Sequence, residues 1–181
     1  PEVYKNVKKS IKKKYRLNIK ELKQYNLNKI LKIDVNKKQV GSDRLANAIS
    51  VINNKDNFII LDFGTATTFD VVLKDRYKGG VIAPGVALSL ENLVKKARLI
   101  PHTKLTKIKN IIGKNTQNAV RSGFYWGYQG LIEKIINLIE KRNKKNFKII
   151  FTGGLSHLYK DTIKKKIKID KDLTIKGLLR L

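Results

Sequence analysis

The chain has 181 residues and a formal net charge of +26, from 40 lysines and arginines against 14 aspartates and glutamates. It has no cysteine and only two histidines, which excludes a disulfide framework, a thiolate metal site, a cysteine nucleophile and a histidine-rich metal cluster. Hydrophobic residues make up 41% of it, enough for a packed core. No apolar run approaches the roughly 20 residues that span a bilayer, and no signal peptide opens the chain. We therefore expect a cytoplasmic protein without a membrane partner.

The positive charge has two explanations. A charge of this size predicts salt-dependent attraction to polyanions such as nucleic acid. The basic residues are mostly lysines, spread from Lys5 to Lys176, and the chain is also rich in asparagine and isoleucine. All three residue types have A+T-rich codons, so a biased genome would produce the same composition. We favour bias, because no basic stripe with interleaved aromatic residues marks a nucleic-acid platform, and we expect no nucleic-acid partner.

Apolar periodicity predicts strands and helices that interleave, which is typical of the α/β class. The first helix is expected to bury one face, and three glycines among the aromatic residues of 123–130 predict close helix packing. A domain boundary is expected near residues 53–57. In chain order, the expected elements are a helix over 2–15, a strand over 30–35, a helix from an N-cap at Ser42 to residue 52, strands over 58–62, 67–73 and 77–82, a helix over 88–97, a long helix from 115 or 116 to 142, a strand over 147–151, a short helix over 159–163, and a basic strand followed by a helix over 173–178.

The most informative segment is LDFGTATTFD, in which Asp62 directly follows a buried strand. Gly64 lets the backbone approach a phosphate, and Thr65, Thr67 and Thr68 offer hydroxyl and amide donors. The Asp62 carboxylate is suited to hold a cation, or a metal-bound water, beside a triphosphate. The competing interpretation is a tight turn with a solvated aspartate, which the length of the motif disfavours.

Two further segments offer ligand-binding chemistry. The Gly153-Gly154 pair after a buried strand permits a flat ligand such as adenine to approach the backbone, although such pairs also form ordinary strand-to-helix turns. The Gly41-Ser42-Asp43-Arg44 segment opens a helix whose free amides favour an anionic group. There Asp43 could act as general base on an alcohol, and Arg44 could hold a carboxylate or a phosphate. Plain helix capping with a surface aspartate and arginine is the alternative.

In this order, the segments resemble those of the type III pantothenate kinases, which belong to the acetate and sugar kinase/Hsp70/actin superfamily. The family's G-A-D-R is similar to GSDR at 41–44, with serine in place of alanine, and its D-F-G-T-A-T-T-F-D is found at 62–70. Its G-G-x-I-x-P-G stretch matches GGVIAPG at 79–85, and its T-G-G matches residues 152–154. A G-x-N-T stretch with a later S-G matches 113–123. The likeness covers nearly the whole chain.

The resemblance implies an actin-like (ribonuclease H-like) ATPase fold, with residues 55–181 forming a complete second domain and 1–54 the remainder of the first. The family's N-terminal D-x-G-N-T/S loop, which grips ATP phosphates, has no counterpart, and the chain starts at Pro1. We therefore expect an N-terminally truncated chain that by itself binds ATP weakly or is inactive. The implied enzyme is a homodimeric kinase that transfers phosphate from ATP to pantothenate, giving 4'-phosphopantothenate in the first step of coenzyme A biosynthesis.

The resemblance also implies roles for individual residues, and completion of the pantothenate pocket across a dimer interface for which the helix after Thr116 is a candidate. Mg²⁺ would offset phosphate charge during in-line transfer. The implied assignments are Asp43 as catalytic base; Gly41, Ser42, Asp43, Arg44 and Thr116 at pantothenate, with Arg44 on its carboxylate; Gly64 and Thr65 at the phosphates; Gly153 and Gly154 at the adenosine; and Asp62 as ligand of a monovalent cation, K⁺ or NH₄⁺.

Two alternatives keep the fold and change the function. The first is a transcription-associated, nucleic-acid-binding protein like the Bvg accessory factors, which the positive charge would suit. The combination of Asp43, Asp62 and Thr65 argues against it, because a binding protein has no need of this set. The second is another kinase or phosphatase of the superfamily, which only the GSDR segment and Thr116 oppose.

Overall fold

The computed structural model describes residues 2–181, whose strands form one mixed sheet in the order β1-β4-β3-β2-β5-β6. Strands β2, β3 and β4 are consecutive antiparallel neighbours, β5 runs parallel to β2 and β6 parallel to β5. The short β1 pairs in parallel with β4 at the edge. The bounds are β1 Lys32–Ile33, β2 Asn57–Phe63, β3 Ala66–Leu73, β4 Arg76–Pro84, β5 Lys148–Gly153 and β6 Ile167–Ile169.

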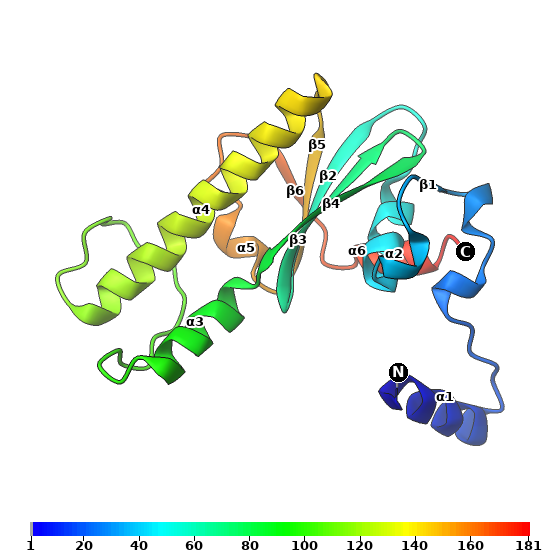
Figure 1. Cartoon of the computed structure of the whole chain (residues 1–181), viewed down its shortest axis with the longest axis horizontal. Helices are drawn as coiled ribbons and strands as arrows, with labels where there is room; N and C mark the ends of the chain where they lie inside the picture. Colours follow the sequence, from blue (N-terminus) through cyan, green and yellow to red (C-terminus); the bar gives the residue numbers. More distant parts are fainter. Residues whose placement is uncertain (1) are drawn as a thin grey trace.

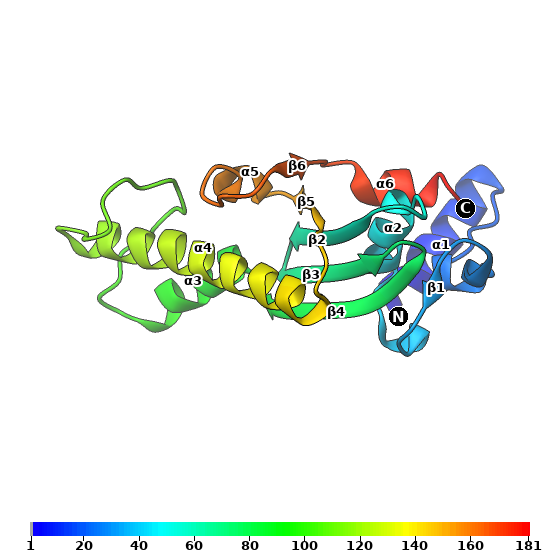
Figure 2. The same cartoon turned by 90° about the horizontal axis from the view of Figure 1, so that it is seen from above.

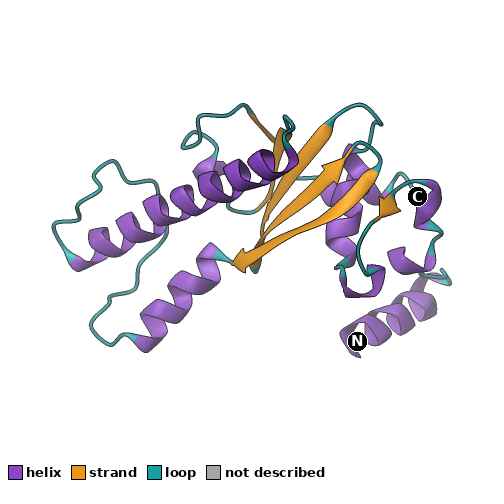
Figure 3. Cartoon of the chain, turned by 45° about the horizontal axis from the view of Figure 1, so that its top comes forward, coloured by secondary structure: helices purple, strands orange, loops and turns teal. Residues whose placement is uncertain are grey.

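Helices cover both faces of this sheet, which confirms the α/β class. Figures 1 and 2 show α2 and α6 on one side of the sheet and α3, α4 and α5 on the other. In Figure 3, α3 and α4 extend well past the end of the sheet and form an arm. The bounds are α1 Glu2–Tyr15, α2 Ser42–Val51, α3 Val86–Lys96, α4 Thr116–Asn143, α5 Ser156–Tyr159 and α6 Leu173–Leu178, with 3-10 turns at Leu22–Gln24, Leu27–Lys29 and Lys37–Gln39.

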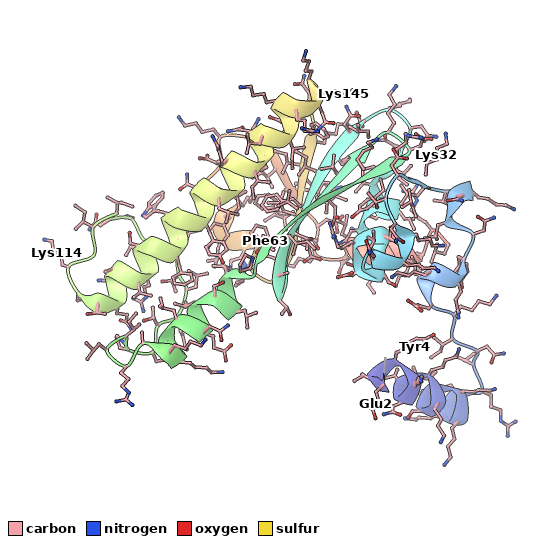
Figure 4. The ribbon with its side chains drawn as sticks, in the orientation of Figure 1. Glu2, Tyr4, Lys32, Phe63, Lys114 and Lys145 are labelled. Atoms are coloured by element: carbon pink, nitrogen blue, oxygen red, sulfur yellow. The ribbon has the colours of Figure 1, made fainter. Side chains whose placement is uncertain are left out.

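Two hydrophobic clusters lie on opposite faces of the sheet, and β2 contributes to both. Phe58 and Ile60 belong to the cluster under α2 and α6, whereas Ile59, Leu61 and Phe63 belong to the cluster under α4 and α5. A strand that is buried on both faces needs a continuous apolar run, which explains the sequence FIILDF. Figure 4 labels Phe63 near the centre of the molecule.

The α2 helix is fixed to the sheet and to the end of the chain. Gly177 of α6 packs so closely on the Ala46 carbonyl that no side chain would fit there. Arg180 donates hydrogen bonds to the carbonyls of Ile49, Ser50 and Ile52 at 2.7 to 3.0 Å, which satisfies the open end of α2. Residues on both sides of position 54 therefore share one core, and the division into two domains stays a prediction.

Three local predictions were wrong. The strand expected over 30–35 is reduced to Lys32–Ile33, and the short helix expected over 159–163 lies at Ser156–Tyr159. Ser42 is not the N-cap of α2, because it is already helical; Gly41 holds that position. The Ser42 hydroxyl donates instead to Glu21, at 3.3 Å.

The burial predicted for the first helix was also wrong, and the close packing predicted for 123–130 involves the aromatic residues but not the glycines. Helix α1 forms as expected, but Val3 and Val7 are 76% and 49% exposed, and the helix stands apart from the rest of the described chain (Figure 1). In α4, Tyr125 is buried and stacks on Tyr159. A Cβ added at Gly123, Gly127 or Gly130 would meet nothing within 4 Å, so this glycine face contacts no other segment of residues 2–181. Periodicity indicates which face is apolar or small but not what covers it. None of the helices in residues 2–181 has the length and apolar content that crossing a membrane requires.

Candidate functional site

Two of the predicted segments, LDFGTATTFD and the Gly153-Gly154 pair, meet at the edge of the sheet where β2 and β5 end. Strands β2 and β5 are parallel and end side by side, so that Asp62 pairs with Thr152 and Phe63 with Gly153. The turn between β2 and β3 consists of Gly64 and Thr65, and lies at the same edge. Carboxyl ends of parallel strands collect functional loops, and the pairing of β2 with β5 places the Gly64-Thr65 turn beside the Gly153-Gly154 pair.

At this edge, the sheet face under α2 changes from apolar to polar. Ile60 pairs with Asp70, and Asp62 pairs with Thr68, so the two aspartates and Thr68 lie on one face. Helix α2 crosses that face and places polar side chains of its first two turns over it. The change from Ile60 to Asp62 marks where the core ends and the site begins.

Arg44 of α2 is held by Asp70 of β3. The Arg44 Nε donates to Asp70 Oδ1 at 2.8 Å, and Nη2 lies 2.7 Å from the same oxygen. The Tyr77 hydroxyl also donates to Oδ1, at 2.6 Å, while Thr68 Oγ1 lies 3.4 Å from Oδ2. Asp70 is fully buried. Burial raises the pKa of Asp70, and the hydrogen bond from Arg44 opposes that rise.

A second chain of hydrogen bonds joins Asp62 to the C-terminal helix. The Asn47 Nδ2 donates to Asp62 Oδ2 at 3.2 Å, and Thr174 Oγ1 donates to Asn47 Oδ1 at 2.7 Å. Asn47 is fully buried. Burial raises the pKa of Asp62, the Asn47 hydrogen bond opposes that rise, and the nearby charge of Asp43 adds to it.

The other oxygen of Asp62, Oδ1, has no hydrogen-bond partner among the described residues and lies beside the glycines of two loops. A Cβ built on Gly153 would come within 2.6 Å of this oxygen, and one built on Gly64 within 3.8 Å. A half-buried carboxylate with a free oxygen fits a cation, because a cation would supply the positive charge that its surroundings lack. Within residues 2–181, no three acidic, histidine or cysteine side chains form a metal-binding group.

Asp43 lies in the first turn of α2 and is exposed. Its carboxylate folds back over Gly41, so a side chain at position 41 would have to displace it. The Asp43 charge raises the pKa values of Asp62 and Asp70, and no hydrogen bond from residues 2–181 engages the Asp43 carboxylate. Asp43 is therefore a carboxylate open to a ligand, next to the bound guanidinium of Arg44.

The three threonines of the predicted phosphate loop differ in whether a ligand could reach them. Thr65 is exposed in the turn. Thr67 is fully buried, so its hydroxyl cannot reach a surface ligand, and the Thr68 hydroxyl is engaged by Asp70. The Gly64 amide donates to the Ala66 carbonyl at 3.1 Å within the turn. Alternation along β3 explains the difference, since neighbouring residues point to opposite faces.

Thr116 is not brought to the other predicted residues. It is the first residue of α4, exposed, with its helix capped by Asn115. Figure 4 places Lys114, two residues earlier, at the far tip of the arm, whereas Phe63 lies next to Asp62 in the middle of the molecule. The start of α2 thus carries Gly41, Ser42, Asp43 and Arg44, whereas Thr116 lies far from it within this chain.

Sequence reasoning missed four residues: Asn47, Asp70, Tyr77 and Thr174. A signal existed for two of them. Asn47 is a buried polar residue in an otherwise apolar stretch of α2, four positions after Asp43, and Asp70 closes the DFGTATTFD motif. By contrast, a hollow of about 860 Å³ lined by Phe58 and Lys148 among others lies at the amino ends of β2 and β5 and includes none of the predicted site residues.

The sheet order and the flanking helices define an actin-like (ribonuclease H-like) ATPase fold, and solved structures agree. A protein from Campylobacter jejuni described as a Baf family transcriptional activator aligns with a TM-score of 0.62 at 22% identity, over 91% of this chain and 78% of that one. A 2-dehydro-3-deoxygalactonokinase protein from Sinorhizobium meliloti aligns with a TM-score of 0.56 at 10% identity, over 76% and 57%. At these identities, the likeness concerns the fold alone.

Sequence comparison defines the family. The profile described as Type III pantothenate kinase matches residues 1–138. A type III pantothenate kinase of Pelagibacter ubique is 62% identical over 180 residues, 99% of this chain and 73% of that protein. One from Cereibacter sphaeroides is 46% identical over 142 residues, 77% of this chain and 55% of that protein. The chain belongs to the type III pantothenate kinase family, and it spans about three quarters of the first relative and just over half of the second.

Proposed function

We propose that the protein to which this chain contributes transfers the γ-phosphoryl group of ATP to the hydroxyl of pantothenate, the first step of coenzyme A synthesis, in the cytoplasm. The observation that carries the proposal is the arrangement on α2. This one helix presents the open Asp43 carboxylate, the bound Arg44 guanidinium and the Asn47 amide that holds Asp62. Family membership supplies the substrate, and these contacts supply groups suited to it.

Each group has a chemical task in this reaction. Asp43 accepts the proton of the attacking hydroxyl, because it is exposed and no other described residue occupies it. The remaining N–H groups of Arg44 bind the pantothenate carboxylate. Thr65, exposed in the β2–β3 turn, donates to phosphate oxygens. Gly153 and Gly154 lie at the proposed adenosine end, where Gly154 borders open space, since an added Cβ there meets nothing within 4 Å.

Cations would complete the charge balance of the site. Asp62 Oδ1 is the proposed ligand of a monovalent cation, K⁺ or NH₄⁺, since no described residue donates to this oxygen and a bound cation would offset the cost of burying the carboxylate charge. When bound, the monovalent cation and Mg²⁺ would offset the negative charge of the phosphates. The residues that hold Asp62, chiefly Asn47, would keep this ligand in place.

A homodimer belongs to the proposal. Thr116 and its exposed surroundings at the tip of the arm cannot meet α2 within one chain, but the arm of a second copy could bring Thr116 to it. The exposed glycines of α4, Gly123, Gly127 and Gly130, form a small-residue face on which another helix could pack closely. Light scattering at several concentrations measures the state, and a monomer that phosphorylates pantothenate would refute this part.

The test is ATP-dependent phosphorylation of pantothenate, with potassium and with sodium, by this chain joined to the part of the Pelagibacter ubique relative that it does not span. The wild type is compared with Asp43→Asn and with a control, Asp161→Asn, whose exposed carboxylate pairs with Lys107. We expect a rate loss of about 100- to 10,000-fold for Asp43→Asn only. A folded wild-type protein that makes no product would refute the proposed function.

A further inference from the structure

Arg44 is anchored along one edge only. A guanidinium has five N–H donors in a rigid plane. The Nε–H donates to Asp70 Oδ1 at 2.8 Å, and Nη2 lies 2.7 Å from the same oxygen in an ion pair. No other hydrogen bond engages Arg44 among residues 2–181, so both hydrogens of Nη1 and the second hydrogen of Nη2 remain available.

The anchor is itself rigid. Asp70 Oδ1 receives the Tyr77 hydroxyl at 2.6 Å in addition to Arg44, and Thr68 lies 3.4 Å from Oδ2. Asp70 is fully buried in the middle of β3, between β2 and β4, and the Arg44 side chain is only 13% exposed. A carboxylate bonded on both oxygens and set in a central strand cannot follow a moving arginine, so it fixes the plane of the guanidinium.

Gly80 of β4 gives the guanidinium its space. Gly80 pairs with Asp70 across the sheet, and a Cβ added there would lie 2.9 Å from Arg44 Nη2 and collide with the Phe69 carbonyl. A side chain at position 80 would displace the guanidinium from Asp70. Three separate elements, α2, β3 and β4, therefore converge on one orientation of Arg44.

From this geometry we infer that Asp70, supported by Tyr77, is a positioning residue for substrate selection: it holds Arg44 so that its outer edge receives the carboxylate of the substrate. The inference rests on the proposed function, in which Arg44 binds that carboxylate. Bidentate capture of a carboxylate needs a guanidinium of fixed plane, and a preorganised one loses less freedom on binding. Asp70 does not touch the substrate and acts only through Arg44.

The substitution Asp70→Asn keeps the shape of the side chain and removes its charge. We expect the KM for pantothenate to rise by about 10- to 100-fold, with kcat within about threefold, because a misplaced binding group weakens capture more than phosphoryl transfer. A merely structural role would not change selectivity, so the readout is the preference for pantothenate over its primary amide, which lacks the carboxylate. Asp70→Asn should reduce that preference, while leaving the KM for the amide unchanged.

A double-mutant cycle provides the second readout. Arg44→Lys removes the planar fork, and if Asp70 acts only through Arg44, adding Asp70→Asn to Arg44→Lys should change the KM by less than about twofold. Additive effects, or an equal loss for pantothenate and its amide, would overturn the inference. If Asp70→Asn does not fold, Tyr77→Phe replaces it, because it removes one hydroxyl from the same oxygen and should lower the same preference.

Calorimetric titration with pantothenate separates the two claims. The assay uses the chain joined to the remaining part of its relative, as above. If the wild type binds pantothenate without phosphorylating it, the proposed function fails, while the selectivity of Asp70→Asn still tests the inference by binding. If the wild type phosphorylates pantothenate and Asp70→Asn keeps full selectivity, the inference alone fails. If the wild type does not bind pantothenate, both fail.

Discussion

Replacing Gly153 by alanine should lower the free energy of unfolding and displace the Asp62 carboxylate, whereas the same change at Gly154 should leave both nearly unchanged. Gly153 has φ of +84°, a backbone conformation that costs an alanine about 1 to 3 kcal/mol. The new Cβ would lie 2.6 Å from both Asp62 Oδ1 and the Phe63 amide nitrogen. Relieving such overlap against a β-strand typically costs about 1 to 3 kcal/mol more. At Gly154, φ is not positive and an added Cβ meets nothing within 4 Å.

The sum for Gly153→Ala is about 2 to 6 kcal/mol, a large part of the 5 to 15 kcal/mol that stabilises a typical protein. Urea denaturation followed by circular dichroism measures it directly, and the melting temperature should fall by at least about 4 °C. Gly154→Ala should stay within about 0.5 kcal/mol of the wild type. Equal stability of the two variants would show that the approach of β5 to Asp62 does not constrain position 153.

Three further substitutions test how the site is held. Asp62→Asn should raise the free energy of unfolding at about pH 7 by about 0.5 to 1 kcal/mol without added potassium, and leave it unchanged near pH 3. Burial raises the pKa of Asp62 above its ordinary 3.8, so the native state binds the proton more tightly than the unfolded state does. The native protein therefore loses stability as the pH rises from 3.8 through the raised pKa. Urea titration of both proteins at about pH 7 and about pH 3 checks this. Thr174→Val should cost about 1 to 3 kcal/mol in the same titration, because it leaves the buried oxygen of Asn47 unpaired. Arg180→Ala should lower stability by about 1 to 2 kcal/mol, since it uncovers three carbonyls at the end of α2, while the exposed control Lys171→Ala should not.

The strands of the sheet could be predicted because each follows from local pattern. The continuous apolar run FIILDF indicates a strand buried on both faces. The pairing with β5 that brings Asp62 to the loop containing Gly153 joins strands far apart in the sequence, and no local pattern specifies it. The contacts that orient the site could not be predicted in this way. Arg44 and Asp70 are 26 residues apart, and Asn47 and Asp62 are 15 apart. Both contacts depend on how α2 is rotated on the sheet, and no local pattern specifies that rotation.

Local sequence pattern also could not predict which segment, or which subunit, covers an exposed helix face. The spacing of Val3 and Val7 correctly predicts a helix, and the glycines of α4 correctly indicate a face that permits close approach. Neither pattern says whether the covering surface lies in the same chain. The same holds for Thr116. Its motif predicts contact with the substrate, but the other residues predicted to bind that substrate lie at the opposite end of the arm.

The precision of the site depends on the core, because one helix serves both. On α2, Leu45, Ala48 and Ile49 are fully or almost fully buried against the apolar half of the sheet, and Arg44 and Asn47 lie over its polar half. A helix rotated by one residue, 100°, would withdraw both polar side chains from their aspartates and expose the apolar ones to the polar half. The hydrophobic cluster under α2 therefore selects the rotation that forms both hydrogen-bonded pairs. Stability and the placement of Arg44 and Asp62 are linked through this helix, so core substitutions in α2 should alter ligand binding without touching a ligand.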